Sequence, residues 1–288
     1  MAELAEQASN WGSHRVFWID SSKLEGDLEF YRNNAHQFDA IGINPIRGFR
    51  LPTVAPLVAL RREIHGLILV GVGPLFDISH IKQLSELQVL VVDGPKERAS
   101  LENFEKLTEF HGDWHKALRV PKRVRVLALN RFAPKTADLT ELAELKQLIG
   151  LNLTSPGIRS LQQIGSLALL NNLEITGAAK LATLHNIEVL QHLRSVDLFK
   201  CPAVSDHELV GACKQITALR FARCGAIKSL AFVESMPALE RFSFLGTDVL
   251  DGNMRPVLGL KAVGFDARPH FSHTQREVDE ILGSRKHG

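Results

Sequence analysis

Gly71 and Gly73 are the residues whose spacing first suggests a ligand site. They follow an apolar, strand-like segment and precede a helical pattern over residues 78–87. In a dinucleotide-binding unit, glycines at this point let the backbone approach a pyrophosphate at the start of a helix. Here Phe76 occupies the third glycine position, and Pro74 stands in the turn. A nucleotide-dependent enzyme that uses Gly71 and Gly73 is therefore kept only as a remote alternative.

His111 and His115, with Asp113 between them, form the densest group of potential metal ligands. Two imidazoles and a carboxylate can bind zinc. The group lacks the helical H-E-x-x-H arrangement, and no cysteine lies nearby in the sequence. We expect these histidines to be solvated or to lie in turns, and we expect no metal site.

The three cysteines favour packing over catalysis, and their odd, low number indicates a reducing compartment. Cys213 lies in an apolar helical pattern and is expected in the core. Cys201 and Cys224 are 23 residues apart in the sequence. In adjacent strands, about 4.8 Å apart, they could form a disulfide, although free thiols are favoured. Since there is also no G-x-S-x-G nucleophile elbow, we expect no enzyme activity and no cofactor.

The composition is that of a folded chain without a strong electrostatic field. Of the 288 residues, 45% are hydrophobic, and 34 basic residues against 32 acidic ones leave a net charge of +2. This balance does not favour non-specific binding to nucleic acids or anionic membranes. The N-terminal residues lack the basic and apolar regions of a secretory signal, and no apolar run approaches the roughly 20 residues of a spanning helix. We expect a cytoplasmic protein that binds no nucleic acid and no membrane.

Leucine is in excess, at 42 of the 288 residues, and the excess follows a repeat. Pairs of apolar residues separated by one residue recur along the chain. From Leu153 to Phe265 the second members of these pairs are 21 to 23 residues apart. The copies occupy residues 17–19, 41–43, 68–70, 90–92, 108–110, 127–129, 151–153, 173–175, 196–198, 219–221, 242–244 and 263–265.

The spacing within each copy predicts one strand and one short helical turn. Period two means that one face of the strand points inward. After the strand, apolar residues follow every three positions, as from Ile158 to Leu173, which predicts a short helix or 3₁₀ turn on the same interior. A single copy cannot bury its apolar face alone, so neighbouring copies must stack.

This pattern resembles the leucine-rich-repeat family, in its short class of about 22 residues and in its bacterial form. The resemblance spans roughly residues 41–282 and implies an α/β solenoid of about 11–12 coils. A curved parallel β-sheet would line the concave face, and short helices or 3₁₀ turns the convex face. The family's asparagine or cysteine position holds Cys201 and Cys224 but Pro156, Ala178 and Thr247 elsewhere. We therefore expect local irregularity of curvature.

The ends of such a stack must be capped, because a bare terminal coil exposes its core. Residues 1–40 are expected to form the N-terminal cap, with an edge strand over 16–19 and a helix over 24–38. Residues 41–273 would form the repeat solenoid, and residues 274–288 a capping helix and tail, all in one domain. Thr274 and Glu277 have the spacing of a capping box at the start of that helix.

Residues that alternate with the inward positions would form the concave face. Near the N-terminus this face would include Gly42, Leu69, Gly71, Val91 and His111. Farther along, Glu174 and Asp197 would lie beside Arg220, and Phe199 and Leu245 would be apolar where solvent is expected. Aromatic and arginine side chains are typical interface anchors. The residues predicted to bind a partner are Asn130, Asn152, Glu174, Asp197, Phe199, Lys200, Arg220, Arg223, Leu245, Asp266 and Arg268.

The resemblance implies recognition of another protein, with no small-molecule substrate. We hypothesise that the chain inhibits or neutralises its partner, as an immunity protein does to a toxin or enzyme. The alternative is a regulatory, targeting or scaffold subunit of an enzyme complex such as a phosphatase.

Overall fold

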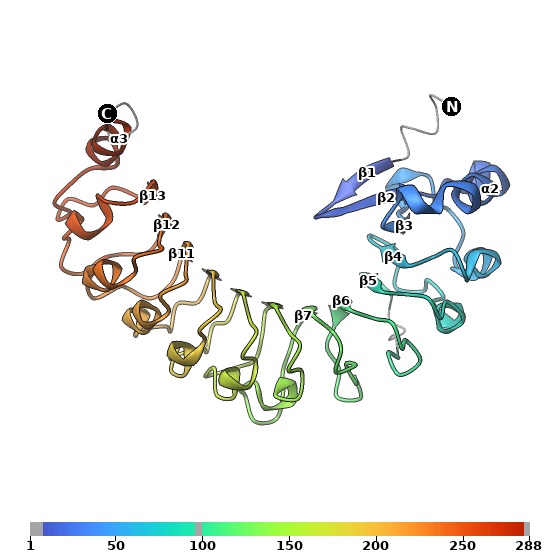
Figure 1. Ribbon diagram of the computed structural model, residues 1–288, viewed down its shortest axis with the longest axis horizontal. Coiled ribbons are helices and arrows are strands. Elements are labelled where there is room, and N and C mark those ends of the chain that lie inside the picture. Colours follow the sequence, from blue (N-terminus) through green and yellow to red (C-terminus); the bar gives the residue numbers. More distant parts are fainter. Residues whose placement is uncertain (1–7, 96–99, 285–288) are drawn as a thin grey trace. The chain divides into compact units, whose positions relative to one another are not determined.

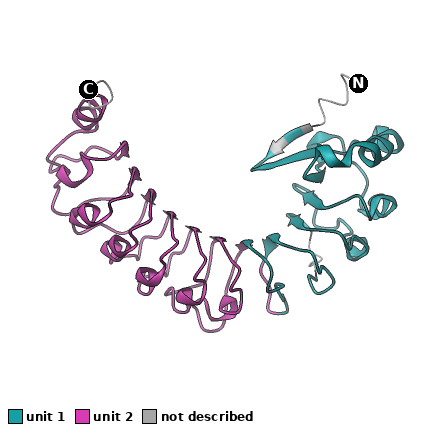
Figure 2. Ribbon diagram, viewed as in Figure 1, with its two compact units in different colours: residues 1–113, 117–126 teal, residues 114–116, 127–288 magenta. Residues whose placement is uncertain are grey.

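The computed structural model describes residues 8–95 and 100–284 (Figure 1). The chain divides into two compact units (Figure 2). Unit 1 comprises residues 1–113 and 117–126, and unit 2 comprises residues 114–116 and 127–288. The predicted boundaries of caps and solenoid, and the assignment of all three to one domain, stay predictions.

Unit 1 is built on a sheet whose strand order follows the chain. β1 and β2 form an antiparallel hairpin, and the strands from β2 to β6 pair in parallel. The eleven-residue helix α2 (Leu24–Asn34) connects β2 to β3. The strands are β1 (Ala8–Trp11), β2 (His14–Trp18), β3 (Ala40–Ile43), β4 (Gly66–Leu69), β5 (Val89–Val92) and β6 (Glu109–Asp113).

Unit 2 repeats one strand and one turn per coil. Its strand order also follows the chain, and β8 to β13 pair in parallel register. With β2 to β6, these strands make twelve in the described part of the chain, as the predicted 11–12 coils require. The strands are β7 (Val126–Asn130), β8 (Gly150–Thr154), β9 (Asn172–Thr176), β10 (Ser195–Phe199), β11 (Ala218–Ala222), β12 (Arg241–Ser243) and β13 (Ala262–Gly264).

The core of unit 2 lies on the inward side of these strands, where the alternating pattern places it. Leu151 pairs with Leu173, and Val196 pairs with both Leu173 and Leu219. All four side chains are buried. The predicted rungs of unit 2 are therefore confirmed, and each coil buries its apolar side chains against the next coil.

Short 3₁₀ segments lie between most of the consecutive strands in the described residues. The helix expected over residues 78–87 is only η5 (Ser79–Gln83), because a coil of this length has room for little more than one tight turn. No helix therefore starts at Gly71 or Gly73, so these glycines do not form the strand–turn–helix of a dinucleotide site. The remaining 3₁₀ segments are η1 (Ser21–Lys23), η2 (Ala35–Gln37), η3 (Pro45–Arg47), η4 (Ala55–Leu60), η6 (Thr140–Leu142), η7 (Ile164–Ser166), η8 (Ile187–Val189), η9 (His207–Ala212), η10 (Ala231–Ser235) and η11 (Arg255–Val257).

The N-terminal elements differ from prediction in two ways. The predicted edge strand pairs on both sides, because Gly12, at a φ of +57°, turns the chain back and adds β1 outside β2. Gly12 adopts this left-handed conformation without a side-chain clash. The helix predicted over residues 24–38 ends at Asn34 and continues only as the three-residue η2.

The register of β4 was also predicted wrongly. Leu67 and Leu69, not Ile68 and the residue after Leu69, pair with the inward positions of β3. The four residues of β4 are all buried, so both faces of this strand are covered. The alternation that normally fixes a register is absent there.

The C-terminal helix α3 (Gln275–Ser284) begins at the predicted capping box. The backbone N–H of Thr274 donates to Glu277 at 2.7 Å, and the N–H of Glu277 donates to Thr274 Oγ1 at 3.3 Å. Val278 and Leu282 are buried, so the helix covers apolar surface at this end. Residues 285–288 of the predicted tail lie outside the described residues.

No helix in the described ranges combines the length and apolarity that a membrane span requires.

Candidate functional site

The sheet face of unit 1 that points away from the repeat core is covered by the protein itself. Val16 and Trp18 form one buried apolar cluster with Ala40, Ile68 and Val91. The Trp18 ring lies so close over β3 that a Cβ on Gly42 would come within 2.4 Å of it. Gly42 and Val91 lie on the predicted side of the sheet. The prediction that this side is open to solvent is wrong here, because the side chains of β2 cover it.

The tip of the β1–β2 hairpin extends this cover to β6. The Trp11 ring lies 5.4 Å from the His111 ring. Glu109 Oε1 lies 3.0 Å from His14 Nε2 and 2.9 Å from His111 Nε2. Burial would raise the pKa of Glu109, but the two histidines outweigh it and lower that pKa. Among the described residues no group of three histidine, cysteine or acidic side chains is placed to hold a metal ion, and His111 contacts Trp11 and Glu109.

Unit 2 presents the corresponding side of strands β7–β13 to solvent, and we call this surface the unit 2 face. Strand pairing places Asn152, Glu174, Asp197 and Arg220 in one row across four adjacent strands. All four side chains are at least partly exposed. The structure thus brings together the central part of the predicted partner-binding set.

Phe199 is the centre of a basic cluster on this face. Its half-buried ring has Arg220 Cζ at 5.1 Å, Lys200 Nζ at 5.2 Å and Arg223 Cζ at 6.0 Å from the ring centroid. The aromatic ring attracts each of these cations. Arg220 Nη1 also donates to both carboxylate oxygens of Asp197, at 2.9 and 3.2 Å. We call these five residues the Phe199 cluster.

The backbone at the strand ends explains how two of these cations reach the ring. Lys200 and Arg223 directly follow β10 and β11, with φ values of +56° and +54°. In this left-handed conformation their N–H groups donate to Ala222 O at 2.9 Å and Leu245 O at 2.8 Å in the next coil. The same conformation recurs one residue after β7, β8 and β9, at Arg131, Ser155 and Gly177. Gly246 has it at the position that corresponds to Arg223 in the next coil.

Glu174 lies beside the cluster and has an altered acidity. Partial burial raises the pKa of Glu174, and the negative charge of Asp197 raises it further. Arg220 and a hydrogen bond with Asn152 act in the opposite direction. The face therefore combines unpaired positive charge at the strand ends with a carboxylate that is less acidic than usual.

The remaining predicted residues lie around this centre. Leu245 is 46% exposed and follows β12. The Asp266 carboxylate accepts a hydrogen bond from the N–H of Gly246 at 2.6 Å, so it stabilises the backbone of the neighbouring coil. Arg268 is exposed in the loop after β13, outside the Phe199 cluster, and Asn130 is half-buried at the end of β7.

A hollow of about 460 Å³ opens beside the Phe199 cluster, over β10 to β13. Small side chains form it because they follow one another at outward positions of four strands. Asp197 and Arg220 belong to the cluster and also line the hollow, and Arg241 is a further charged residue in its lining. The hollow was not predicted, although small residues occupy successive outward positions in the sequence: Ser195, Ala218, Ser243, Ala262 and Gly264.

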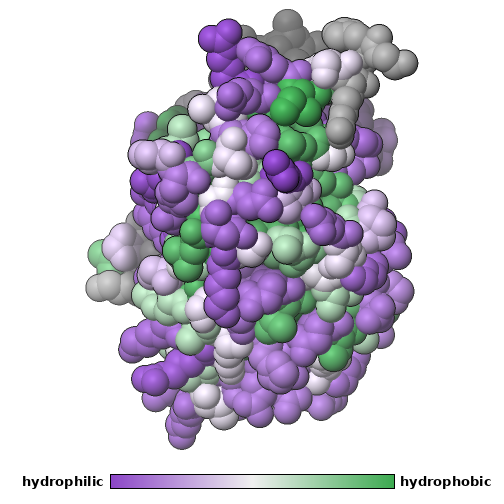
Figure 3. Space-filling view, turned by 90° about the vertical axis from the view of Figure 1, so that its left-hand side faces the viewer, coloured by the Kyte–Doolittle hydropathy of each residue, from purple (hydrophilic) through white to green (hydrophobic). Residues whose placement is uncertain are grey.

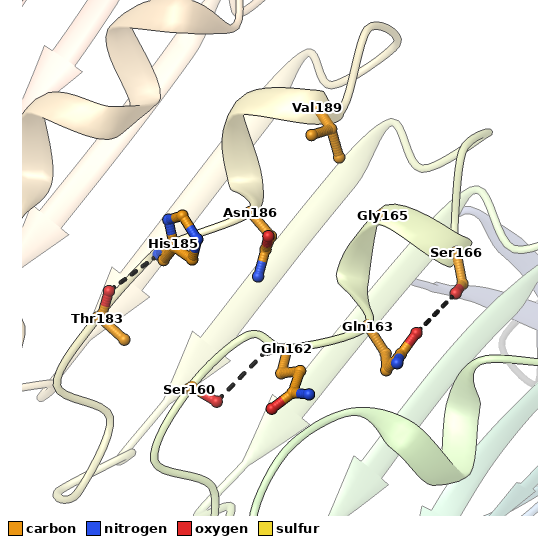
Figure 4. A pocket seen from close by; sticks show the side chains of 9 residues that line it. All are labelled: Ser160, Gln162, Gln163, Gly165, Ser166, Thr183, His185, Asn186 and Val189. Carbon is orange, nitrogen blue, oxygen red and sulfur yellow. Dashed lines mark hydrogen bonds between the residues drawn. The ribbon is translucent and has the colours of Figure 1, made fainter.

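A second groove, of about 680 Å³, lies between η7 and η8, away from the strands (Figure 4). Val189 is half exposed and lies over Gly165, where a Cβ would come within 2.9 Å. The other lining side chains are polar, and Ser166 donates to Gln163 at 3.3 Å. Hydrophobic side chains also form only small, separate patches on the mostly hydrophilic surface seen in Figure 3.

The arrangement of strands and turns matches solved structures. An internalin (InlF) of Listeria monocytogenes matches with a TM-score of 0.56 at 13% identity, over 93% of this chain and 84% of that one. The chain has a leucine-rich-repeat fold. Internalin C2 of the same organism matches with a TM-score of 0.41 at 19% identity, over 72% and 83% of the two chains. A leucine-rich-repeat protein of Leptospira interrogans matches with a TM-score of 0.30 at 17% identity, over 83% and 80%. No family profile and no curated protein sequence matches the chain.

The leucine-rich-repeat coil also explains the cysteines. The Cys201 thiol donates to Ile175 O at 3.6 Å, and the Cys224 thiol donates to Leu198 O at 3.3 Å. In the next coil the Thr247 hydroxyl donates to Phe221 O at 2.6 Å. Thiols and a hydroxyl thus satisfy carbonyls of the preceding coil, and Cys201 and Cys224 are free thiols in the structure.

Proposed function

We propose that this chain is a non-catalytic binding module that holds a protein partner on the unit 2 face. The observation that supports this proposal most strongly is that the Phe199 cluster lies next to the hollow over β10–β13. A half-buried aromatic ring, arginine side chains and a recess for a partner's side chain are the usual components of an interface centre. A repeat solenoid commonly binds through such an extended sheet face.

The outcome of binding that we favour is inhibition of the partner, as for an immunity protein and its toxin or enzyme. This part rests on analogy with free-standing binders. A regulatory or targeting subunit would instead change its partner's specificity and leave turnover intact. Cytoplasmic location stays a prediction.

The test compares the partners of the wild type with those of a face variant. Phe199→Ala/Arg220→Ala removes the ring and its paired cation, while Val189→Ala changes the groove between η7 and η8. We expect quantitative affinity purification to recover one enzyme with the wild type and Val189→Ala and to lose it with the face variant. The purified pair should bind at least about tenfold more weakly with the face variant, since such anchors carry about 1–3 kcal/mol each.

The activity of the recovered enzyme then separates the outcomes. Loss of its turnover on binding supports inhibition, whereas changed specificity with full turnover supports a regulatory subunit. Equal recovery with the face variant would reject the unit 2 face as the binding surface.

A further inference from the structure

Two cations of the Phe199 cluster have no negative partner. Arg220 is paired with Asp197 at 2.9 Å. Lys200 and Arg223 contact the Phe199 ring, and neither forms an ion pair within residues 8–95 and 100–284. Both are exposed and follow adjacent strands. The cluster therefore offers two neighbouring positive charges that an incoming ligand could neutralise.

The backbone conformation of Lys200 and Arg223 is unfavourable for residues other than glycine. The left-handed conformation at Lys200 and Arg223 is one that glycine adopts freely, and Gly177 and Gly246 occupy the same position in neighbouring coils. A Cβ at Gly246 would come within 2.8 Å of Arg223 Cγ, so this glycine leaves room for the arginine stem. The conformation belongs to the repeat, since Arg131 and Ser155 share it, and in two adjacent coils it places the two cations beside Phe199.

The hollow supplies an apolar contact next to the charges. Arg220 borders the hollow and also lies over Phe199, so the two features are continuous. Small side chains line the recess, and a bulky partner side chain could enter it. A ligand that fits both features carries carboxylates together with an aromatic or large aliphatic group.

The charge pattern favours a protein over a nucleic acid. Glu174, Asp197 and Asp266 lie on the same face as the cations, and they would repel a continuous phosphate backbone. The chain as a whole carries a net charge of only +2. Discrete carboxylates on a folded or extended peptide can reach Lys200 and Arg223 while leaving the acidic positions uncontacted.

We propose that the unit 2 face binds an acidic segment of its protein partner, with carboxylates at Lys200 and Arg223 and a bulky side chain in the hollow over β10–β13. This inference rests on the proposed function and specifies the chemistry of the partner. The carboxylates replace ions and water around two cations already positioned by the aromatic ring. The bulky side chain gives the segment its register along the strands.

The experiment selects ligands from a displayed library of random 12-residue peptides on the immobilised 288-residue protein. We expect the selected peptides to be enriched at least threefold in aspartate and glutamate over the starting library and to contain aromatic or large aliphatic residues. Synthetic copies of the best peptides should bind the wild type at least tenfold more tightly than Lys200→Glu/Arg223→Glu. The matched control, Lys146→Glu/Lys180→Glu, reverses two exposed charges of unit 2 outside the cluster and should bind like the wild type.

A second variant separates charge from folding. Lys200→Gly/Arg223→Gly removes both cations and relieves the backbone, so its loss of binding cannot come from strain. Selected peptides without acidic enrichment, or peptides that bind both cluster variants as well as the wild type, overturn the inference. If such neutral peptides bind Phe199→Ala more weakly than the wild type, the unit 2 face remains the proposed binding surface and only the acidic character of the partner is rejected. If the library yields no binding peptide, the inference that the face binds an acidic segment is rejected. Binding of a 20-nucleotide single-stranded RNA that the acidic peptides cannot displace would instead assign the cluster to nucleic acid.

Discussion

Lys200 and Arg223 occupy a backbone position at which glycine has the lowest energy. A left-handed conformation costs a non-glycine residue about 1 kcal/mol. The side chains at this position therefore reduce stability slightly while they extend the basic cluster. Their orientation could not be derived from the sequence, because alternation ends with the strand and only the left-handed turn directs them toward Phe199.

Replacing these residues by glycine should uncouple stability from binding. For Arg223→Gly we expect a free energy of unfolding equal to the wild type or higher by up to about 1 kcal/mol, because the strain disappears. Urea unfolding followed by circular dichroism measures this difference. Lys214→Gly, at an exposed position without positive φ, is the comparison and should not be more stable than the wild type. A marked loss of stability in Arg223→Gly would show that the arginine contacts outweigh the strain.

His207 makes the fold sensitive to acid. Its side chain is fully buried against Phe221, with ring centroids 5.0 Å apart, and neither ring nitrogen has a hydrogen-bond partner in the described part of the chain. Burial lowers the pKa of His207 to about 4. The unfolded chain then takes up a proton near pH 6.5, while the folded chain does so only near pH 4.

The wild type should therefore lose stability as the pH falls from about 6.5 to 4, by as much as about 3 kcal/mol from this residue. His207→Phe should remove most of that loss, since phenylalanine cannot take up a proton. Urea unfolding at pH 7.0, 5.5 and 4.5 measures the change, with exposed His192→Phe as the control. The same pH profile in wild type and His207→Phe would place the acid sensitivity elsewhere.

The β1–β2 hairpin acts as a cover for one sheet face. Trp18 lies over β3 and joins Val16, Ala40, Ile68 and Val91 in one cluster, and its Nε1 donates to Ser9 at 2.8 Å. This element was predicted only in part. Residues 8–11 lack an apolar alternation, and β4 is apolar on both faces, so the pattern revealed neither the hairpin nor the register.

Removing the Trp18 ring should open this face. We expect Trp18→Ala to lower the free energy of unfolding by about 3–5 kcal/mol, as for other large aromatic truncations in a core. Amide hydrogens of β3, β4 and β5 should exchange faster, and a hydrophobic dye should bind more strongly. Phe232→Ala, in a turn of unit 2, serves as a comparison in which β3 to β5 keep their protection. Unchanged exchange of β3 to β5 in Trp18→Ala would mean that the hairpin does not protect this face.

The C-terminal helix depends on its capping box. Thr274→Ala removes one hydroxyl that accepts from Glu277 N and leaves a helix N–H without that partner. We expect a loss of about 1 kcal/mol in the free energy of unfolding and faster amide exchange at the start of α3. Thr274→Ser should restore most of the stability, because serine caps equally well. No difference between Thr274→Ala and the wild type would show that the end coil is held by Val278 and Leu282 alone.

The same strand-and-turn repeat builds both units, but the units differ in whether the sheet side away from the core is covered. In unit 1 the side of the sheet away from the repeat core is covered by the hairpin over β3 to β5, whereas in unit 2 this side stays open and carries the Phe199 cluster and the hollow. The 42 leucines predicted the repeat and the inward rungs correctly, because inward positions must be apolar in every coil. They could not predict which sheet face is open, since that depends on the hairpin that covers unit 1.

The proposed acidic partner implies a specific dependence on salt. With a net charge of only +2, the whole chain exerts little long-range attraction, so steering must come from the local charges of Lys200 and Arg223. Raising NaCl from 50 to 500 mM should slow association by about tenfold and change dissociation less, because screening acts mainly on the encounter of exposed charges. Surface plasmon resonance with the recovered partner separates the two rates. Lys200→Glu/Arg223→Glu should abolish or invert the salt dependence of association, while Lys146→Glu/Lys180→Glu should keep it. An association rate that does not change with the NaCl concentration would contradict this prediction. It would mean that the Phe199 ring and the hollow hold the partner and that Lys200 and Arg223 do not contribute to association.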